Sequence, residues 1–230
     1  FETEQGRKFF ESLEEKYDNQ ANLFVLGKLE GDWGNVRRHC LVQAAAVEVL
    51  GDALGFPVEV VMCMAQVAVL HDSRKRIDVM YDRRLTRGQE PLDFTKEQAV
   101  FFDYVFQIAN PDPALTSALT PWFLPKVLLG KASFLQLIQF LVDDMAKGDE
   151  IVSFDERIDE VSARNPNPEP EVEKLLGRPY WDVEREVGHR VITMVASILK
   201  ARYVVFDESN PGRSLADLIN QRIAERISEV

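Results

Sequence analysis

The sequence predicts an all-α fold, a helical bundle with a C-terminal helical extension. Apolar residues recur at spacings of three and four along most of the chain, alternating strand patterns are scarce, and proline or glycine separates the periodic segments. The chain has 230 residues, of which 46% are hydrophobic, so it can bury a core of its own and is too apolar to be mainly disordered. It contains no run of about 18 apolar residues, so we expect no transmembrane helix.

The expected elements follow from periodicity and from capping residues. The sequence predicts helices over 8–17, from Asn35 as N-cap to Leu54, from a first turn with Pro57 to about His71, and over 95–109, 131–147, 155–163 and 180–206. A last helix is expected after the NPG at 210–212 and runs to residue 230. The polar segment 74–94 and the proline-punctuated segment 110–122 are expected to be loops with short helical turns. Residues 164–174, with three prolines, form the clearest linker. We therefore expect a helical domain over 1–164 and a C-terminal extension over 165–230, which packs on the core or on the partner subunit of a homodimer.

Charge and cysteine content narrow the function classes. A net charge of −11 and a pI near 4.9 disfavour binding to long nucleic acids and to anionic membranes, both of which require a basic surface. The only cysteines, Cys40 and Cys63, are too few for a disulfide framework or a thiolate zinc finger. The free thiols and the acidity predict a cytoplasmic protein.

Two of the three histidines stand on apolar helix faces. His71 continues the stripe of Val60, Met64 and Val67, and His39 flanks the apolar stripe of its own helix. A later apolar helix carries Asp143 and Asp144, while His189 lies far along the chain and is interpreted as structural. Imidazole nitrogens and carboxylate oxygens bind divalent first-row metals, and buried carboxylates without a partner are costly. The sequence therefore predicts a metal site, in which adjacent His71 and Asp72 share an ion near a helix end.

Three segments carry a family resemblance: NVRRHCL at 35–41, AVLHDSRK at 68–75 and FLVD at 140–143. They resemble the H…HD…D motif of the HD-domain metal-dependent phosphohydrolases, which are all-α bundles, and the resemblance covers about residues 30–160. It implies the ligands His39, His71, Asp72 and Asp143. Asp143 is preferred to Asp144 because such sequences often place the aspartate five residues before a glycine, here Gly148, although helical periodicity leaves both open. Members with two metals add histidines between the HD pair and the last aspartate, and none stands between 72 and 143, so one ion is expected.

The resemblance implies hydrolysis of a phosphate ester of a small molecule, such as a nucleotide, with one divalent ion (Mn, Co, Ni, Fe, Mg or Zn are not distinguished). Asp72 and Lys75 are the expected catalytic residues. Lys75, four residues after His71, and Arg38, next to His39, are the expected phosphate-binding cations. Two alternatives stay open. One is a non-catalytic HD module that binds metal or nucleotide and acts as a sensor or interaction domain, and the other is a helical scaffold without a site.

Overall fold

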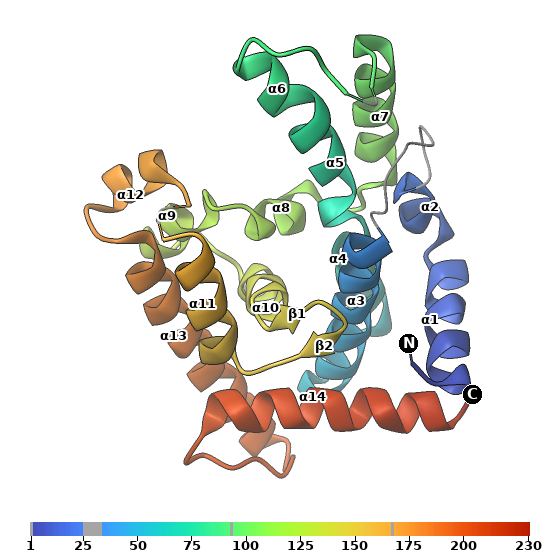
Figure 1. Ribbon diagram of the computed structural model, residues 1–230. Helices are drawn as coiled ribbons and strands as arrows, with labels where there is room; N and C mark the ends of the chain where they lie inside the picture. Colours follow the sequence, from blue (N-terminus) through green and yellow to red (C-terminus); the bar gives the residue numbers. More distant parts are fainter. Residues whose placement is uncertain (1, 25–33, 93, 167) are drawn as a thin grey trace.

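The computed structural model describes residues 2–24, 34–92, 94–166 and 168–230 and confirms the all-α class (Figure 1). None of the described helices is both long enough and apolar enough to cross a membrane. The α-helices are α1 (Glu4–Lys16), α2 (Asp18–Ala21), α3 (Gly34–Leu54), α4 (Val58–Leu70), α5 (Lys75–Ile77), α6 (Arg83–Thr86), α7 (Lys96–Ala109), α8 (Pro113–Thr116), α9 (Phe123–Leu128), α10 (Phe134–Asp143), α11 (Phe154–Arg164), α12 (Pro170–Leu176), α13 (Tyr180–Ala201) and α14 (Pro211–Ser228). Three-residue and four-residue 3₁₀ turns, a π-helical turn at Asp78–Asp82, and an antiparallel pair of two-residue strands, β1 (Ala146–Lys147) and β2 (Glu150–Ile151), complete the described elements.

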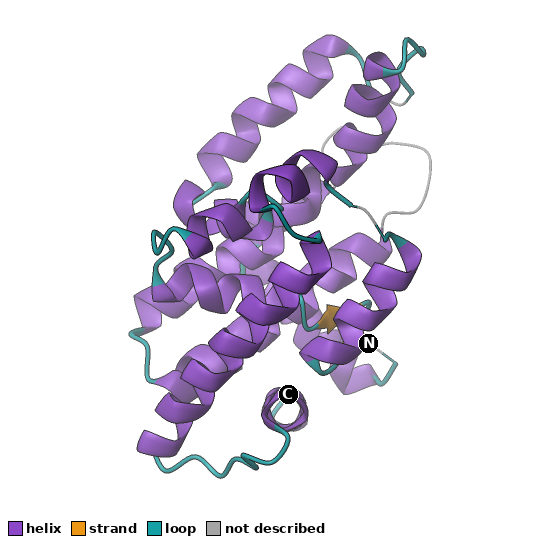
Figure 2. Ribbon diagram, turned by 90° about the vertical axis from the view of Figure 1, so that its left-hand side faces the viewer, coloured by secondary structure: helices purple, strands orange, loops and turns teal. Residues whose placement is uncertain are grey.

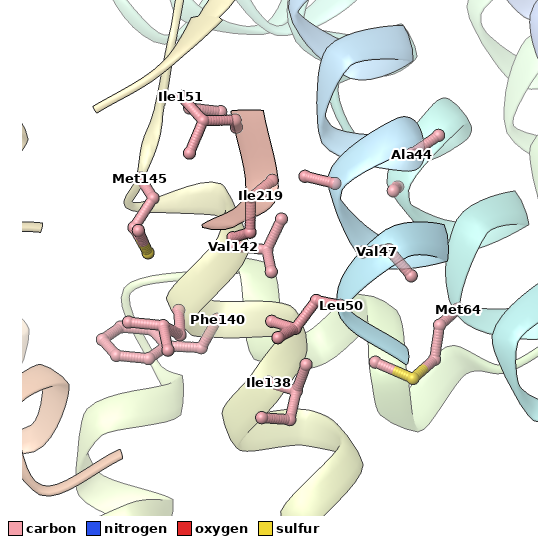
Figure 3. Close-up of a cluster of buried hydrophobic side chains, with 14 of the residues drawn as sticks. Ala44, Val47, Leu50, Met64, Ile138, Phe140, Val142, Met145, Ile151 and Ile219 are labelled. Atoms are coloured by element: carbon pink, nitrogen blue, oxygen red, sulfur yellow. The ribbon is translucent and has the colours of Figure 1, made fainter. Parts of the chain in front are cut away.

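The core is built around α3, α4 and α10. Every residue of α3 from Cys40 to Leu54 is buried except Asp52, because the alanines 44–46 let neighbouring helices approach from several sides. Figure 3 shows Leu50 and Met64 near Ile138 of α10 in this core. The α10 helix lies between two groups of helices, α3 and α4 on one side and α11 and α13 on the other (Figure 1).

One buried carboxylate, Glu48 of α3, forms hydrogen bonds with both the first and the last helix. Glu48 accepts hydrogen bonds from Lys16 (2.7 Å) and Tyr17 of the N-terminal region and from Arg226 of α14 (2.6 Å). Burial, followed by the hydrogen bond to Glu48, raises the pKa of Tyr17. The helix α13 contributes Val183, Val187 and other buried residues to the same core, and Figure 2 shows α14 nearly end-on beside the bundle. The C-terminal helices therefore pack on the core of their own chain.

Several expected boundaries are wrong. The segment 74–94 is more helical than expected, since α5, the π turn and α6 span 75–86; Ile77 is buried there, and Arg74 binds Asp82 and Asp103, each at 2.8 Å. Figure 1 shows this segment and α7 projecting together from the bundle. Asn35 lies within α3 and does not cap it.

The ends of the later helices also differ from expectation. The expected helix 131–147 covers only Phe134–Asp143, because Ser133 caps its start and a turn at Gly148, with φ of +61°, joins β1 to β2. The linker contains α12, whose first residue is Pro170, a favoured position for proline. The expected helix 180–206 ends at Ala201, and residues 203–206 lie outside any helix or strand.

Candidate metal centre

The four side chains expected to bind metal come from three parts of the fold. His39 lies in the second turn of α3, and Asp143 is the last residue of α10. His71 and Asp72 open the 3₁₀ turn His71–Arg74 that follows α4 directly, so the adjacent pair stands at a helix end as the sequence predicted. His71 and Asp72 thus stand directly before α5, the start of the segment that projects from the bundle in Figure 1.

Both imidazoles approach Asp143, and Asp72 lies beside His71. Nε2 of His39 lies 3.3 Å and Nε2 of His71 lies 3.4 Å from the same atom, Oδ1 of Asp143. Nε2 of His71 is 3.9 Å from Oδ2 of Asp72, and His39, His71 and Asp72 each offer a ligand atom within 4.8 Å of the others. Charge-assisted hydrogen bonds are shorter, about 2.7–2.9 Å, whereas two atoms about 2.1 Å from one ion lie about 3.0–3.4 Å apart at the usual coordination angles. The separations therefore fit a group of ligands that could hold a metal ion.

His71 is held in the orientation that a ligand requires. Its Nδ1 lies 2.8 Å from the carbonyl oxygen of Ala68, which accepts a hydrogen bond only if Nδ1 carries the proton. Nε2 is then the nitrogen with a free lone pair, and it faces Asp143. The Cys40 thiol lies on the Nδ1 side, 3.7 Å away, and burial raises its pKa, so Cys40 is placed as a neighbour of His71 and not as a ligand.

The cluster attracts positive charge. Burial works against the charged form of His71, but Cys40, Asp72 and Asp143 around it raise its pKa well above the usual value. Burial works against the carboxylate of Asp143 as well, but His71 and His39 hold its pKa far below the usual range. The charged form of each group is thus stabilised by an opposite charge beside it. A bound cation would supply such a charge to the carboxylates.

The two expected phosphate-binding cations differ in position. Lys75 donates to Oδ2 of Asp72 at 2.7 Å and lines a cavity of about 320 Å³ together with His39, Asp72 and Asp143. Arg38 is exposed and is absent from the described lining of this cavity. Neighbouring helix residues point about 100° apart, so the arginine next to His39 in sequence faces away from it.

The opposite end of the same cavity carries residues that the sequence did not single out as a site. Asp144 interacts with Glu184 of α13, and Tyr180, Trp181 and Arg157 also line the cavity. Burial raises the pKa of Glu184 to about 7, and burial together with the charges of Glu184 and Asp143 raises the pKa of Asp144. One signal was available in the sequence: Glu184 stands in a stripe of buried apolar residues of α13, Tyr180, Val187, Val191 and Val195.

His189 lies outside the cluster. Its Nε2 is 2.8 Å from Oδ1 of Asp155, and its ring meets the edge of Phe154. Its side chain is 52% exposed, so its contacts link α13 to α11 at the surface, as the structural interpretation predicted.

Comparisons with known proteins assign no family to this chain. No model of a protein family, no curated protein and no solved structure matches this chain. The resemblance to HD-domain phosphohydrolases therefore stays a prediction that depends on the H…HD…D spacing.

Proposed function

We propose that this protein is a metal-dependent phosphohydrolase that cleaves a phosphate ester of a small molecule at a site with one divalent ion. The observation that supports it best is the approach of both imidazole Nε2 atoms to one oxygen of Asp143, at 3.3 and 3.4 Å, where His39 and Asp143 line a cavity. Two nitrogens and two carboxylates are a donor set for Mn²⁺, Fe²⁺, Co²⁺, Ni²⁺ or Zn²⁺. A six-coordinate ion held by four such ligands keeps two positions for oxygen atoms of water or phosphate.

His39, His71, Asp72 and Asp143 would hold the ion. When bound, a divalent ion lowers the pKa of a coordinated water and neutralises charge on a phosphoryl group. The carbonyl of Ala68 keeps Nε2 of His71 turned toward the cluster. Asp72, which also contacts Lys75, is placed to accept a proton from a water molecule in the cavity.

Lys75 would bind the phosphate. Its Nζ is tied to Asp72 at 2.7 Å, and this pair holds the ammonium group at the cavity wall. An ammonium group there offers further N–H donors to phosphate oxygens. It can also give a proton to the leaving oxygen. Arg38 has no role in this proposal, because it faces away from the cavity.

The proposal is tested by measuring metal and turnover in the same samples. We expect about one divalent ion per chain by inductively coupled plasma mass spectrometry, and phosphate release with Mn²⁺, Co²⁺, Ni²⁺ or Mg²⁺ from a panel of nucleotides, sugar phosphates and 4-nitrophenyl phosphate. His71→Ala combined with Asp72→Ala should abolish both. His189→Ala, which removes an imidazole outside the cluster, should change neither.

Two results would contradict the proposal. A wild-type protein without metal, or a double variant that binds metal as the wild type does, would remove the site. A protein that holds the ion but releases phosphate from no substrate would favour the non-catalytic alternative, a module that senses or binds its ligand.

A further inference from the structure

Part of the cavity lining has no role in the proposed metal and phosphate site. His39, Asp72, Lys75 and Asp143 belong to that site. The other lining residues include six apolar ones, Ala118, Leu119, Pro121, Phe140, Val161 and Trp181. The cavity has a volume of about 320 Å³, at the lower limit of ligand pockets, which range over about 300–1,000 Å³. A phosphate at the metal therefore leaves room for a small leaving group, which must contact these other residues.

The buried carboxyl groups of the lining interact with each other. Asp144 and Glu184 hydrogen-bond to each other, and Tyr180 hydrogen-bonds to Glu184. Oδ2 of Asp144 and Oε2 of Glu184 have almost no accessible surface. These two oxygens therefore present no acceptor to a molecule in the cavity.

Three further polar side chains of the lining already donate to other groups of the chain. Nη1 of Arg157 donates to Glu160 at 2.8 Å, and Nε1 of Trp181 donates to the carbonyl oxygen of Asn165 at 2.8 Å. The hydroxyl of Thr120 donates to a backbone carbonyl oxygen at 2.9 Å. A hydroxyl group that entered this part of the cavity would give up hydrogen bonds to water and find few free partners, which is costly.

The apolar residues of the lining keep surface that a ligand can cover. Leu119, Val161 and Trp181 pack against the hydrophobic core with part of their side chains and remain partly exposed. They come from three separate elements, the 3₁₀ turn Ser117–Leu119, α11 and α13. Carbon atoms that cover this surface remove apolar area from water on both partners, which favours binding.

We propose that these residues bind an apolar leaving group, so that the substrate is the phosphate ester of a small apolar alcohol and not of a sugar or polyol. Hydrolysis breaks the P–O bond to this alcohol, and water supplies the hydroxyl group of the phosphate product and the proton of the released alcohol. This inference rests on the proposed phosphohydrolase function and specifies its substrate class.

The experiment compares two esters of equal chain length. n-Butyl phosphate carries a terminal methyl group where 3-hydroxypropyl phosphate carries a hydroxyl group, and both release primary alcohols of similar acidity. In the wild type with Mn²⁺ we expect kcat/KM for n-butyl phosphate to be higher by about tenfold or more, the factor that corresponds to burial of a hydroxyl group without a partner.

Two variants add polar groups to the lining. Leu119→Asn should reduce this ratio to about threefold or less, because an amide of similar size offers the hydroxyl group a partner. Val161→Thr, which adds a hydroxyl group and keeps the size of the side chain, should lower the ratio in the same direction. The matched control is Leu129→Asn, the same change at a residue that is 67% exposed and outside the described lining, and it should keep the wild-type ratio. Melting temperatures show whether each variant is folded.

A binding measurement removes the chemical step from the comparison. n-Butylphosphonate and 3-hydroxypropylphosphonate contain no P–O–C bond that could be cleaved. Isothermal titration should show tighter binding of n-butylphosphonate to the wild type and to Leu129→Asn, and a smaller preference in Leu119→Asn and Val161→Thr.

The outcomes separate this inference from the function on which it rests. Equal kcat/KM for the two esters, or a higher value for 3-hydroxypropyl phosphate, would overturn the inference and leave the phosphohydrolase standing. A preference for n-butyl phosphate that Leu119→Asn and Val161→Thr both retain would also overturn it, because the apolar chain would then bind elsewhere. Absence of phosphate release from every ester would instead refute the proposed function, and the inference with it.

Discussion

Asp143 and Asp144 are neighbours in the chain and have opposite electrostatic surroundings. Burial works against the charged form of both carboxyl groups. The histidines at one end of the cavity nevertheless lower the pKa of Asp143. At the other end burial, Glu184 and Asp143 together raise the pKa of Asp144. The first end is a set of opposite charges, and the second is a pair of carboxyl groups that hydrogen-bond to each other. The same residue type therefore faces opposite charges at one end and a like group at the other, and the helix that packs against it decides which.

The largest expected effect tests the separation of the two aspartates. Asp143→Asn removes a carboxylate that contacts both imidazoles, so the affinity for Mn²⁺ or Co²⁺ should fall by about 100-fold or more. Asp144→Asn changes a side chain that points toward Glu184 and should alter that affinity by about threefold or less. Isothermal titration calorimetry with either metal measures both. Equal losses in the two variants would show that both carboxylates belong to one site.

The pH dependence of stability sharpens the same comparison. Burial raises the pKa of Glu184 from 4.5 to about 7, so the folded chain keeps a proton that the unfolded chain releases. The stability linked to this proton is complete below pH 4.5 and is lost as the pH rises through 7. Between pH 5 and 7.5 the free energy of unfolding of the metal-free wild type should therefore fall, relative to Glu184→Gln, by roughly 1–3 kcal/mol.

Urea titrations at the two pH values measure this difference. Asp182→Asn should follow the wild type, because its side chain is exposed. A Glu184→Gln profile parallel to the wild-type profile would contradict the assignment of a raised pKa to Glu184.

A third prediction concerns a substitution that should displace Glu184 and leave the histidines in place. A Cβ at Gly188 of α13 would overlap the ring of Phe154 in α11, which is fully buried. Gly188→Ala should therefore cost about 1–3 kcal/mol by overpacking and shift Glu184, one helical turn away. Thermal unfolding measures the cost. The affinity for metal should stay within about threefold of wild type, and its loss together with stability would mean that the two ends are not independent.

The smallest expected effect separates the two cations that the sequence suggested. Lys75→Met removes an ammonium group from the cavity wall, and kcat/KM should fall about tenfold if that group binds phosphate. Arg38→Met removes an exposed charge and should change kcat/KM by about twofold or less. Steady-state kinetics on one phosphate ester distinguish them, and the reverse order would show that the substrate approaches from the side of Arg38.

The approach of His39, His71 and Asp72 to one another could be predicted from the sequence, because these residues follow local periodicity. His71 extends an apolar stripe, and the end of α4 brings His71 and Asp72 to one point. The fold class followed from the same periodicity. Arg38 is next to His39 in the sequence but is exposed and outside the described cavity lining, because neighbouring residues on a helix point in different directions. The choice between Asp143 and Asp144 required knowledge of the facing helices, which periodicity does not supply.

The carboxylate end escaped prediction for a different reason. Glu184 belongs to a segment outside the resemblance, and only tertiary packing brings α13 against α10. The sequence predicts a loop with short helical turns over 74–94 and understates their extent, because these turns are stabilised by ion pairs of Arg74 with Asp82 and Asp103. Asp103 lies on another helix, α7. Such contacts between distant segments leave no periodic pattern in the sequence.

The most direct test of the metal centre is a crystal structure of the protein soaked in Mn²⁺, with anomalous diffraction locating the ion. We expect one peak about 2.0–2.3 Å from Nε2 of His39, Nε2 of His71 and Oδ1 of Asp143, with a carboxylate oxygen of Asp72 as the fourth ligand. A crystal without an anomalous peak between these side chains, or with its strongest peak between Asp144 and Glu184, would contradict the assignment of the metal to the histidine end of the cavity.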